Sequence, residues 1–207
     1  MGYVKKSNRK DDISKEHIVA KFMLDVYRDN GFVPIKTKKE LDIKGIDLIL
    51  YKDGKQYLVD EKAAITALSG RLNTFCFELC KHGYNDSIGW FLDSTKLTTH
   101  YNVIYITSKA NDVSKPDKIE SFLLDSVKLR SYIIPMLQEH DIHYNTLASF
   151  MDSMPAFHGK HYYYLDDGVK LCYSEYIHPE QPINVIVPKA ILKNMADCVL
   201  YKEFTRR

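Results

Sequence analysis

Two aspartates and a lysine in the first third of the chain have the residue types and spacing of a divalent-metal site. Asp47 is followed by twelve residues and then by Asp60-Glu61-Lys62. Carboxylate oxygens favour hard cations, so this set predicts Mg²⁺, with Mn²⁺ as a substitute. A bound cation of this kind can activate water and stabilise charge on a phosphate, and the Lys62 ammonium can assist both tasks. The predicted chemistry is hydrolysis of a phosphate ester.

The residues between these groups predict a β-hairpin that brings them together. Two apolar runs flank Asp53-Gly54, a dipeptide that tolerates the positive φ angles of a tight turn. With this dipeptide in the turn, Asp47 lies opposite Asp60. Because side chains alternate between the faces of a strand, Lys62 shares their face and Glu61 points to the other side.

Two opposed carboxylates would repel each other, because paired strand residues have Cβ atoms about 4.5–5.5 Å apart. A cation bound between Asp47 and Asp60 removes this repulsion. The alternative is that both aspartates lie at solvated strand ends, with Lys62 as an ordinary ion-pair partner.

The pattern Asp47…Asp60-Glu61-Lys62 resembles the core of the PD-(D/E)XK nuclease superfamily, which has the restriction-endonuclease-like fold. In that family an acidic residue begins one strand, and an acidic residue and a lysine lie on the next. Ile46 stands where the family has a proline. The resemblance implies catalytic roles for Asp47, Asp60 and Lys62, with the backbone carbonyl of Glu61 as a further metal ligand.

Apolar residues at three- and four-residue spacing predict a helix over Lys15–Asn30, capped by Ser14 and ended by Asn30-Gly31. This segment resembles the first helix of several nucleases of the superfamily, including resolvase-like members. The resemblance implies that Glu16 approaches the metal and takes part in catalysis. The alternative is that Glu16 only interacts favourably with the helix dipole.

The hairpin is apolar on both faces near its middle, which predicts helices on both sides of a sheet. The expected fold is α/β: a three-layer α/β/α sandwich with a central mixed sheet, plus a C-terminal α+β elaboration. Residues 1–13 are expected to form a basic arm, 14–110 the nuclease-like core, and 111–207 an elaboration within the same domain. The further predicted elements are a helix over Arg71–His82, strands over Phe32–Lys38, Gly89–Phe91, Asn102–Thr107 and Lys118–Leu124 (an edge strand), helices over Val127–Glu139 and Asn145–Met154, a hairpin of Tyr162–Leu165 with Val169–Tyr173, and a strand over Ile183–Val187 leading into a helix.

The net charge is only +2, so the distribution of basic residues is more informative than their sum. Basic residues near the predicted site can hold a phosphate backbone without reading sequence. DNA is the expected partner, RNA remains an alternative, and a homodimer is possible; a merely solvated basic surface is the other interpretation. The candidate contacts are Lys36, Lys38, Lys39, Lys44, Arg71 and Lys96, together with the arm residues Lys5, Lys6, Arg9 and Lys10.

The second half of the chain is rich in tyrosine and histidine. These residues could stack on the bases of a single strand, but ordinary sheet packing explains them better. Zinc sites built from its histidines, or from Cys76, Cys80 and His82, have ligand-like spacing with little further support. No apolar run has the length of a membrane span and no secretory signal is evident, so a cytoplasmic protein is expected.

A metal-dependent deoxyribonuclease is therefore the leading hypothesis from the sequence. One alternative is a catalytically silent nucleic-acid-binding module of the same fold. Another is an interaction subunit of a phage or defence complex that uses the tyrosine-rich half.

Overall fold

The computed structural model describes residues 9–65, 67–174 and 180–204. The chain forms two compact units that alternate along the sequence. Among the described residues, the hairpin unit comprises residues 9–65, 67–73, 95–129 and 190–204, and the tyrosine-rich unit comprises residues 74–94, 130–174 and 180–189. The sequence predicts instead a division near residue 110. The arm residues Lys5 and Lys6 lie outside the described part of the chain.

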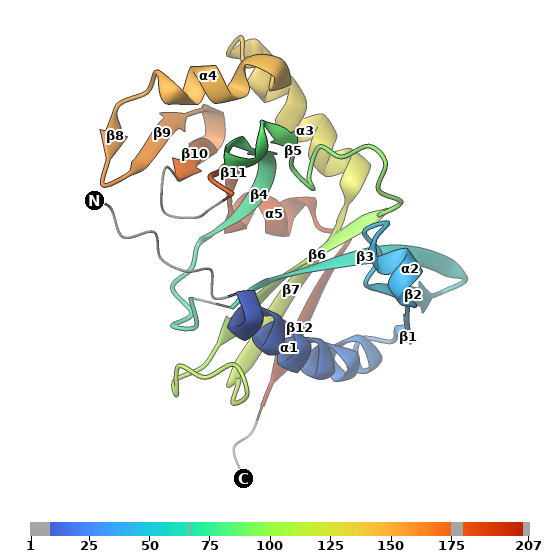
Figure 1. Ribbon diagram of the computed structural model, residues 1–207. Coiled ribbons are helices and arrows are strands. Elements are labelled where there is room, and N and C mark those ends of the chain that lie inside the picture. The colour runs from blue at the N-terminus through green and yellow to red at the C-terminus, as the bar shows by residue number, and fades with distance from the viewer. Residues whose placement is uncertain (1–8, 66, 175–179, 205–207) are drawn as a thin grey trace. The chain divides into compact units, whose positions relative to one another are not determined.

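A mixed six-stranded sheet forms the centre of the hairpin unit (Figure 1), with the order β1-β2-β3-β6-β7-β12. Every neighbouring pair is antiparallel except β3 and β6, which are parallel. This arrangement confirms the α/β class and the mixed sheet. The elements of the unit are α1 (Arg9–Asp29), β1 (Val33–Lys36), α2 (Lys39–Asp42), β2 (Leu48–Lys52), β3 (Lys55–Ala64), β6 (His100–Thr107), β7 (Lys118–Asp125) and β12 (Cys198–Glu203).

Helix α1 covers one face of this sheet (Figure 1). Its apolar stripe, which includes Val19, Met23 and Val26, packs in one core cluster with Leu50 and Val59. After α1 the chain turns at Gly31, which has a φ of 79° and is therefore in a conformation that favours glycine. On the opposite face Ile49 and Leu58 are only partly buried, so a second helical layer over the hairpin is not established.

The predicted hairpin is confirmed in its turn and its register. Asp53 and Gly54 both have positive φ, and Lys52 pairs with Lys55. The ladder then runs to the pair Leu48–Val59. The residue before it, Asp47, donates its backbone N–H to the carbonyl of Val59 at 2.9 Å, so Asp47 lies immediately beyond the regular ladder.

An antiparallel six-stranded sheet organises the tyrosine-rich unit, with the order β5-β4-β11-β10-β9-β8. The predicted hairpin of β9 and β10 is confirmed. The elements are β4 (Thr74–Lys81), β5 (Ser87–Ile88), α3 (Ser126–Glu139, whose first four residues belong to the hairpin unit), α4 (Leu147–Asp152), β8 (Ala156–Phe157), β9 (Lys160–Tyr164), β10 (Lys170–Ser174), β11 (Pro182–Pro188) and the short 3₁₀ turns His82–Tyr84, Tyr144–Thr146 and Asp166–Gly168. Helix α5 (Lys189–Met195) leads into β12 and, apart from Lys189, belongs to the hairpin unit.

The helix predicted over Arg71–His82 is wrong: this segment contains the strand β4. Its apolar residues fit a helical stripe through Phe75, Cys76 and Leu79, but they also alternate as Phe75, Phe77 and Leu79. Pairing with β11 decides between the two patterns, because it buries Phe77 and Leu79 completely. Cys76 is exposed and Cys80 is buried, so the two do not share one helical turn.

Three smaller predictions also need correction. Helix α1 begins at Arg9, six residues before the predicted start. The strand predicted over Gly89–Phe91 is displaced to β5. Strand β7 is not an edge strand, because the unpredicted strand β12 pairs with its outer side. The helix predicted over Val127–Glu139 is α3, which does not end at Pro135. In the described part of the chain, no helix is both long and apolar enough to cross a membrane.

Candidate functional site

The chain reaches Asp47 through a tightly held loop. Gly45 has a φ of 77°, and a Cβ atom at this position would lie 2.7 Å from the Thr98 hydroxyl. Thr98 in turn donates a hydrogen bond to the Gly45 carbonyl, and the Lys96 ammonium donates to the Ile43 carbonyl at 2.8 Å. The segment before β6 therefore fixes the loop that positions Asp47, and glycine is required where the two segments approach.

The Asp47 carboxylate is oriented toward β3. Its Oδ2 accepts a hydrogen bond from the backbone N–H of Glu61 at 2.7 Å. The backbone carbonyl of Asp47 accepts a hydrogen bond from the Thr37 hydroxyl at 2.9 Å. Asp47 is therefore fixed at both its main chain and its side chain, beside the strand that carries the second acidic residue.

Asp60 and Lys62 lie on the same face of β3, as the two-residue period predicts. The Lys62 Nζ is 2.7 Å from Oδ1 of Asp60, and Asp60 is only 7% exposed. Burial opposes the charge of Lys62, but the carboxylates of Asp60, Asp47 and Glu16 more than offset it and raise the pKa of Lys62. Lys62 is therefore a firmly protonated cation.

The carboxyl of Asp47 is destabilised as an anion. Burial, and after it the charge of Asp60, raises the pKa of Asp47 to about 7, even though Lys62 and the Glu61 N–H act in the opposite direction. The one ammonium group of Lys62 therefore does not compensate the charges of the buried Asp60 and the partly buried Asp47. Additional positive charge between Asp47 and Asp60 would stabilise both in their ionised form.

Glu61 faces the other side of the sheet, as predicted, and joins a buried network beneath α1. Its Oε1 accepts a hydrogen bond from the Tyr27 hydroxyl at 2.7 Å, and the Tyr27 oxygen accepts one from Asn102 Nδ2 at 2.6 Å. Burial raises the pKa of Glu61 to about 7, while the bond from Tyr27 lowers it. The Oδ1 atom of Asn102, a fully buried residue, has no hydrogen-bond partner among the described residues. The side chain of Glu61 thus anchors β3 to α1.

Glu16 is the fourth acidic residue predicted at the site, and it lies on α1. Burial raises its pKa, and the charge of Lys62 lowers it. Glu16 also interacts electrostatically with Asp60. The structure thus brings Glu16 into the electrostatic environment of Lys62 and Asp60 from the helix predicted to carry it.

The residues predicted to contact nucleic acid differ in the interactions that they make within the protein. Lys96 is partly buried and holds the loop before Asp47. Lys36 lies on the edge strand β1, where its charge acts on Glu61. Lys39 lies in α2. The remaining candidates, Lys38, Lys44 and Arg71, are exposed on segments next to the hairpin.

The three carboxylates of Asp47, Asp60 and Glu61 do not form the tightest candidate for a metal in the described part of the chain. Among residues 9–65, 67–174 and 180–204, the one group of three or more potential ligands with one ligand atom from each within 4.8 Å of the others is His100, Asp125 and Asp197. The sequence indicates His100 only as a member, with Lys96, of a polar segment that could contact phosphates or strand ends, with a hairpin loop as the favoured interpretation. The predicted zinc spacings bring together no such group among the described histidines and cysteines, and all four cysteines are free.

Tyr27→Phe tests the network beneath α1. Removal of the hydroxyl leaves Glu61 without its donor and Asn102 without its acceptor, so we expect a loss of about 1–3 kcal/mol in the free energy of unfolding. Chemical denaturation measures the change. Phe22→Leu on the same helix is the control for altered packing. An unchanged midpoint for Tyr27→Phe would contradict the network.

Comparisons with known proteins add no evidence on identity. No family model, no curated protein and no solved structure matches this chain. The resemblance to the PD-(D/E)XK nucleases therefore rests on the residues of the site alone.

Proposed function

We propose that this protein hydrolyses phosphodiester bonds of DNA, using Asp47, Asp60 and Lys62 with a divalent cation. One observation carries the proposal: the Lys62 ammonium lies 2.7 Å from the buried Asp60, beside a second, partly buried carboxyl, Asp47, whose pKa is raised to about 7. Carboxyl groups whose pKa values are perturbed by burial and by a neighbouring charge are common at catalytic sites. The same arrangement is costly for stability alone, because it holds repelling charges out of water.

The donor set suits a hard divalent cation. All the candidate ligands of the site are oxygen atoms, which hard cations prefer. Such an ion would also neutralise the excess negative charge of Asp47 and Asp60. Asp47 and Asp60 would hold the ion, with the carbonyl of Glu61 and the carboxylate of Glu16 as the further ligands that the resemblance implies. When bound, Mg²⁺ or Mn²⁺ supplies Lewis-acid polarisation of the phosphate and a more acidic water.

Lys62 has a definite part in this mechanism. Its pKa is raised, so it keeps its proton near neutral pH and is poorly suited to act as a general base. We assign it the role of a hydrogen-bond donor that orients the attacking water and stabilises negative charge on the phosphate. Water would attack the phosphorus opposite the leaving 3′ oxygen. The products would be a 3′ hydroxyl and a 5′ phosphate, as the resemblance implies.

DNA as the substrate is supported by the exposed basic residues around the hairpin. Lys38, Lys44 and Arg71 can contact phosphates without reading base sequence. RNA is the alternative polymer, and a homodimer would allow both strands of a duplex to be cut. The three-layer nuclease sandwich and a cytoplasmic location belong to the same proposal.

The test is incubation of the protein with supercoiled plasmid, linear duplex and RNA, with Mg²⁺, with Mn²⁺ and with chelator. We expect metal-dependent nicking or degradation of DNA that chelator abolishes. A salt-sensitive gel shift without cleavage would favour the silent binding module instead. The absence of both activities would contradict the proposal and favour an interaction subunit.

A further inference from the structure

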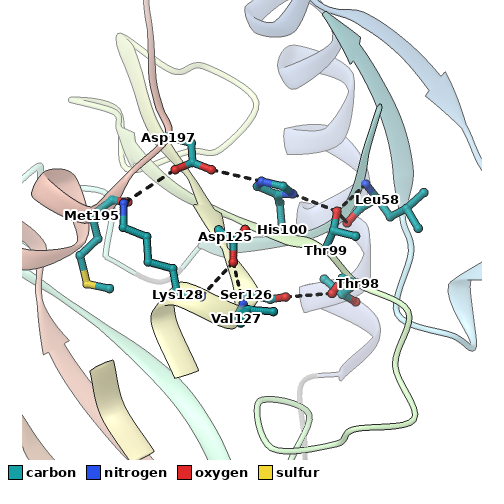
Figure 2. Close-up of polar contacts among 10 residues, drawn as sticks. All are labelled: Leu58, Thr98, Thr99, His100, Asp125, Ser126, Val127, Lys128, Met195 and Asp197. Carbon is teal, nitrogen blue, oxygen red and sulfur yellow. Dashed lines mark hydrogen bonds and ion pairs between the residues drawn. The ribbon is translucent and has the colours of Figure 1, made fainter. Parts of the chain in front are cut away.

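A second cluster of potential metal ligands lies in the hairpin unit, separate from Asp47 and Asp60. His100 begins β6, Asp125 ends β7 and Asp197 precedes β12, and Figure 2 shows the three side chains converging. One ligand atom from each lies within 4.8 Å of the others. His100 and Asp125 are cross-strand partners, and the backbone N–H of Asp197 donates to the Leu123 carbonyl at 2.9 Å. The sheet therefore holds all three in place.

The imidazole of His100 is buried and oriented by its neighbours. His100 is 9% exposed, and the ring of Tyr57 packs edge-on against it at a centroid distance of 4.8 Å. Its Nδ1 lies 2.9 Å from the Thr99 hydroxyl, and its Nε2 lies 3.3 Å from Oδ2 of Asp197. The ring thus presents Nε2 to the carboxylates and Nδ1 to the protein.

The Thr99 hydroxyl holds the Nδ1 side of the His100 ring. Its oxygen accepts a hydrogen bond from the Leu58 N–H at 2.9 Å and lies 3.3 Å from the Leu58 carbonyl. In the tautomer that donates from Nδ1–H to this oxygen, Nε2 presents a lone pair toward the Asp197 carboxylate, and a metal ion bound there would join the two ligands.

The two carboxylates retain oxygens for such a cation. Oδ1 of Asp125 accepts the N–H groups of Val127 and Lys128, both at 2.8 Å, and so caps α3. A carboxylate that caps through one oxygen keeps the other for a ligand bond. Oδ1 of Asp197 lies 3.8 Å from the Lys128 ammonium, while its Oδ2 faces His100.

We propose that His100, Asp125 and Asp197 bind a divalent transition-metal ion, for which Zn²⁺ is the probe. One imidazole with two carboxylates suits zinc better than Mg²⁺, which prefers oxygen ligands alone. Nε2 of His100 and Oδ2 of Asp197 are already about as far apart as two ligands of one tetrahedral zinc ion. The site is independent of the proposed nuclease chemistry, because it shares no residue with Asp47, Asp60 or Lys62.

Lys128 separates this proposal from a purely structural ion pair. Its ammonium also donates to the Met195 carbonyl at 2.9 Å, and it is more than half exposed. If Asp197 binds a metal, Lys128 competes with that metal for the carboxylate. Lys128→Met should then tighten Zn²⁺ binding roughly two- to fivefold. In a structural ion pair the same substitution would leave Zn²⁺ binding unchanged.

The experiment is titration of Zn²⁺ into the metal-free, full-length chain by calorimetry, in an Asp47→Asn, Asp60→Asn background that silences the first site. We expect stoichiometric binding that weakens at least about tenfold in His100→Ala and in Asp197→Asn. Asp197 is exposed, so its variant tests the site even if His100→Ala does not fold. Thermal denaturation with and without Zn²⁺ should change in parallel.

His140→Ala is the matched control, because His140 has an equivalent Nε2–Oδ2 contact of 3.3 Å with Asp166. No third ligand joins that pair among the described residues. Substitution of Co²⁺ should give d–d absorption without thiolate charge-transfer bands. Zn²⁺ binding that is equal in the His100, Asp197 and His140 variants, a thiolate band, or no binding at all would overturn the proposal.

Discussion

Lys62→Ala should slow DNA cleavage by roughly 10²- to 10³-fold while leaving DNA binding nearly intact. The partly buried ammonium lies 2.7 Å from Asp60, and in the proposed mechanism it acts on the reacting phosphate and not on the rest of the DNA backbone. Removal of one preorganised electrostatic group commonly lowers turnover by roughly 10²- to 10³-fold. We therefore expect a loss of that size in the single-turnover cleavage rate, with the apparent Kd in a gel-shift titration changed less than about threefold.

Lys55→Ala is the control for this variant, because Lys55 lies on the same strand but is exposed next to the hairpin turn. It should cleave DNA at the wild-type rate. Lys62→Arg adds a second check, since it keeps the charge but changes its geometry, and should recover only part of the activity. Loss of binding with retained cleavage in Lys62→Ala would disprove the role assigned to this residue.

Asp47→Asn should make the metal-free protein more stable at alkaline pH. The pKa of Asp47 is about 7 in the folded protein and about 3.9 in an unfolded chain, so the native state binds more protons between these values. Its stabilising contribution is complete below about pH 4 and is lost as the pH rises through about 7. At pH 8 the wild type should therefore be about 2–4 kcal/mol less stable than Asp47→Asn, relative to their difference at pH 4.

Denaturant unfolding at pH 4, 6 and 8 measures this difference, and Asp53→Asn in the exposed hairpin turn is the matched control. Mg²⁺ should restore stability to the wild type at pH 8, because the cation binds the ionised carboxylates. It should have little effect on Asp47→Asn. Parallel pH profiles for wild type and Asp47→Asn would show that Asp47 is not destabilised in the folded state.

The sequence was sufficient to predict the hairpin and the residues that share its face. The turn chemistry of Asp53-Gly54 and the period of two fix the register, and the structure confirms both as far as Leu48 and Val59. These are local signals. They placed Asp60 and Lys62 together and Glu61 on the other side without knowledge of any distant residue.

Features that depend on contacts between residues far apart in the chain cannot be predicted from the sequence pattern alone. Strand β4 looked helical because its apolar residues satisfy both periods, and only pairing with β11, about a hundred residues later, selects the strand. The contact between Tyr27, Glu61 and Asn102 joins three separate elements. His100, Asp125 and Asp197 likewise come from three segments with no shared motif, so their spacing in the sequence carries no ligand pattern.

Plasmid nicking by wild type and Asp60→Asn over a range of Mg²⁺ concentrations tests whether the hairpin carries a catalytic metal site. Both proteins must first show the same folded circular dichroism spectrum. We expect nicking that rises with Mg²⁺ in the wild type and is lost in Asp60→Asn. Equal nicking by the two proteins, or no nicking of any DNA by the wild type with Mg²⁺ or Mn²⁺, would contradict the proposed nuclease function.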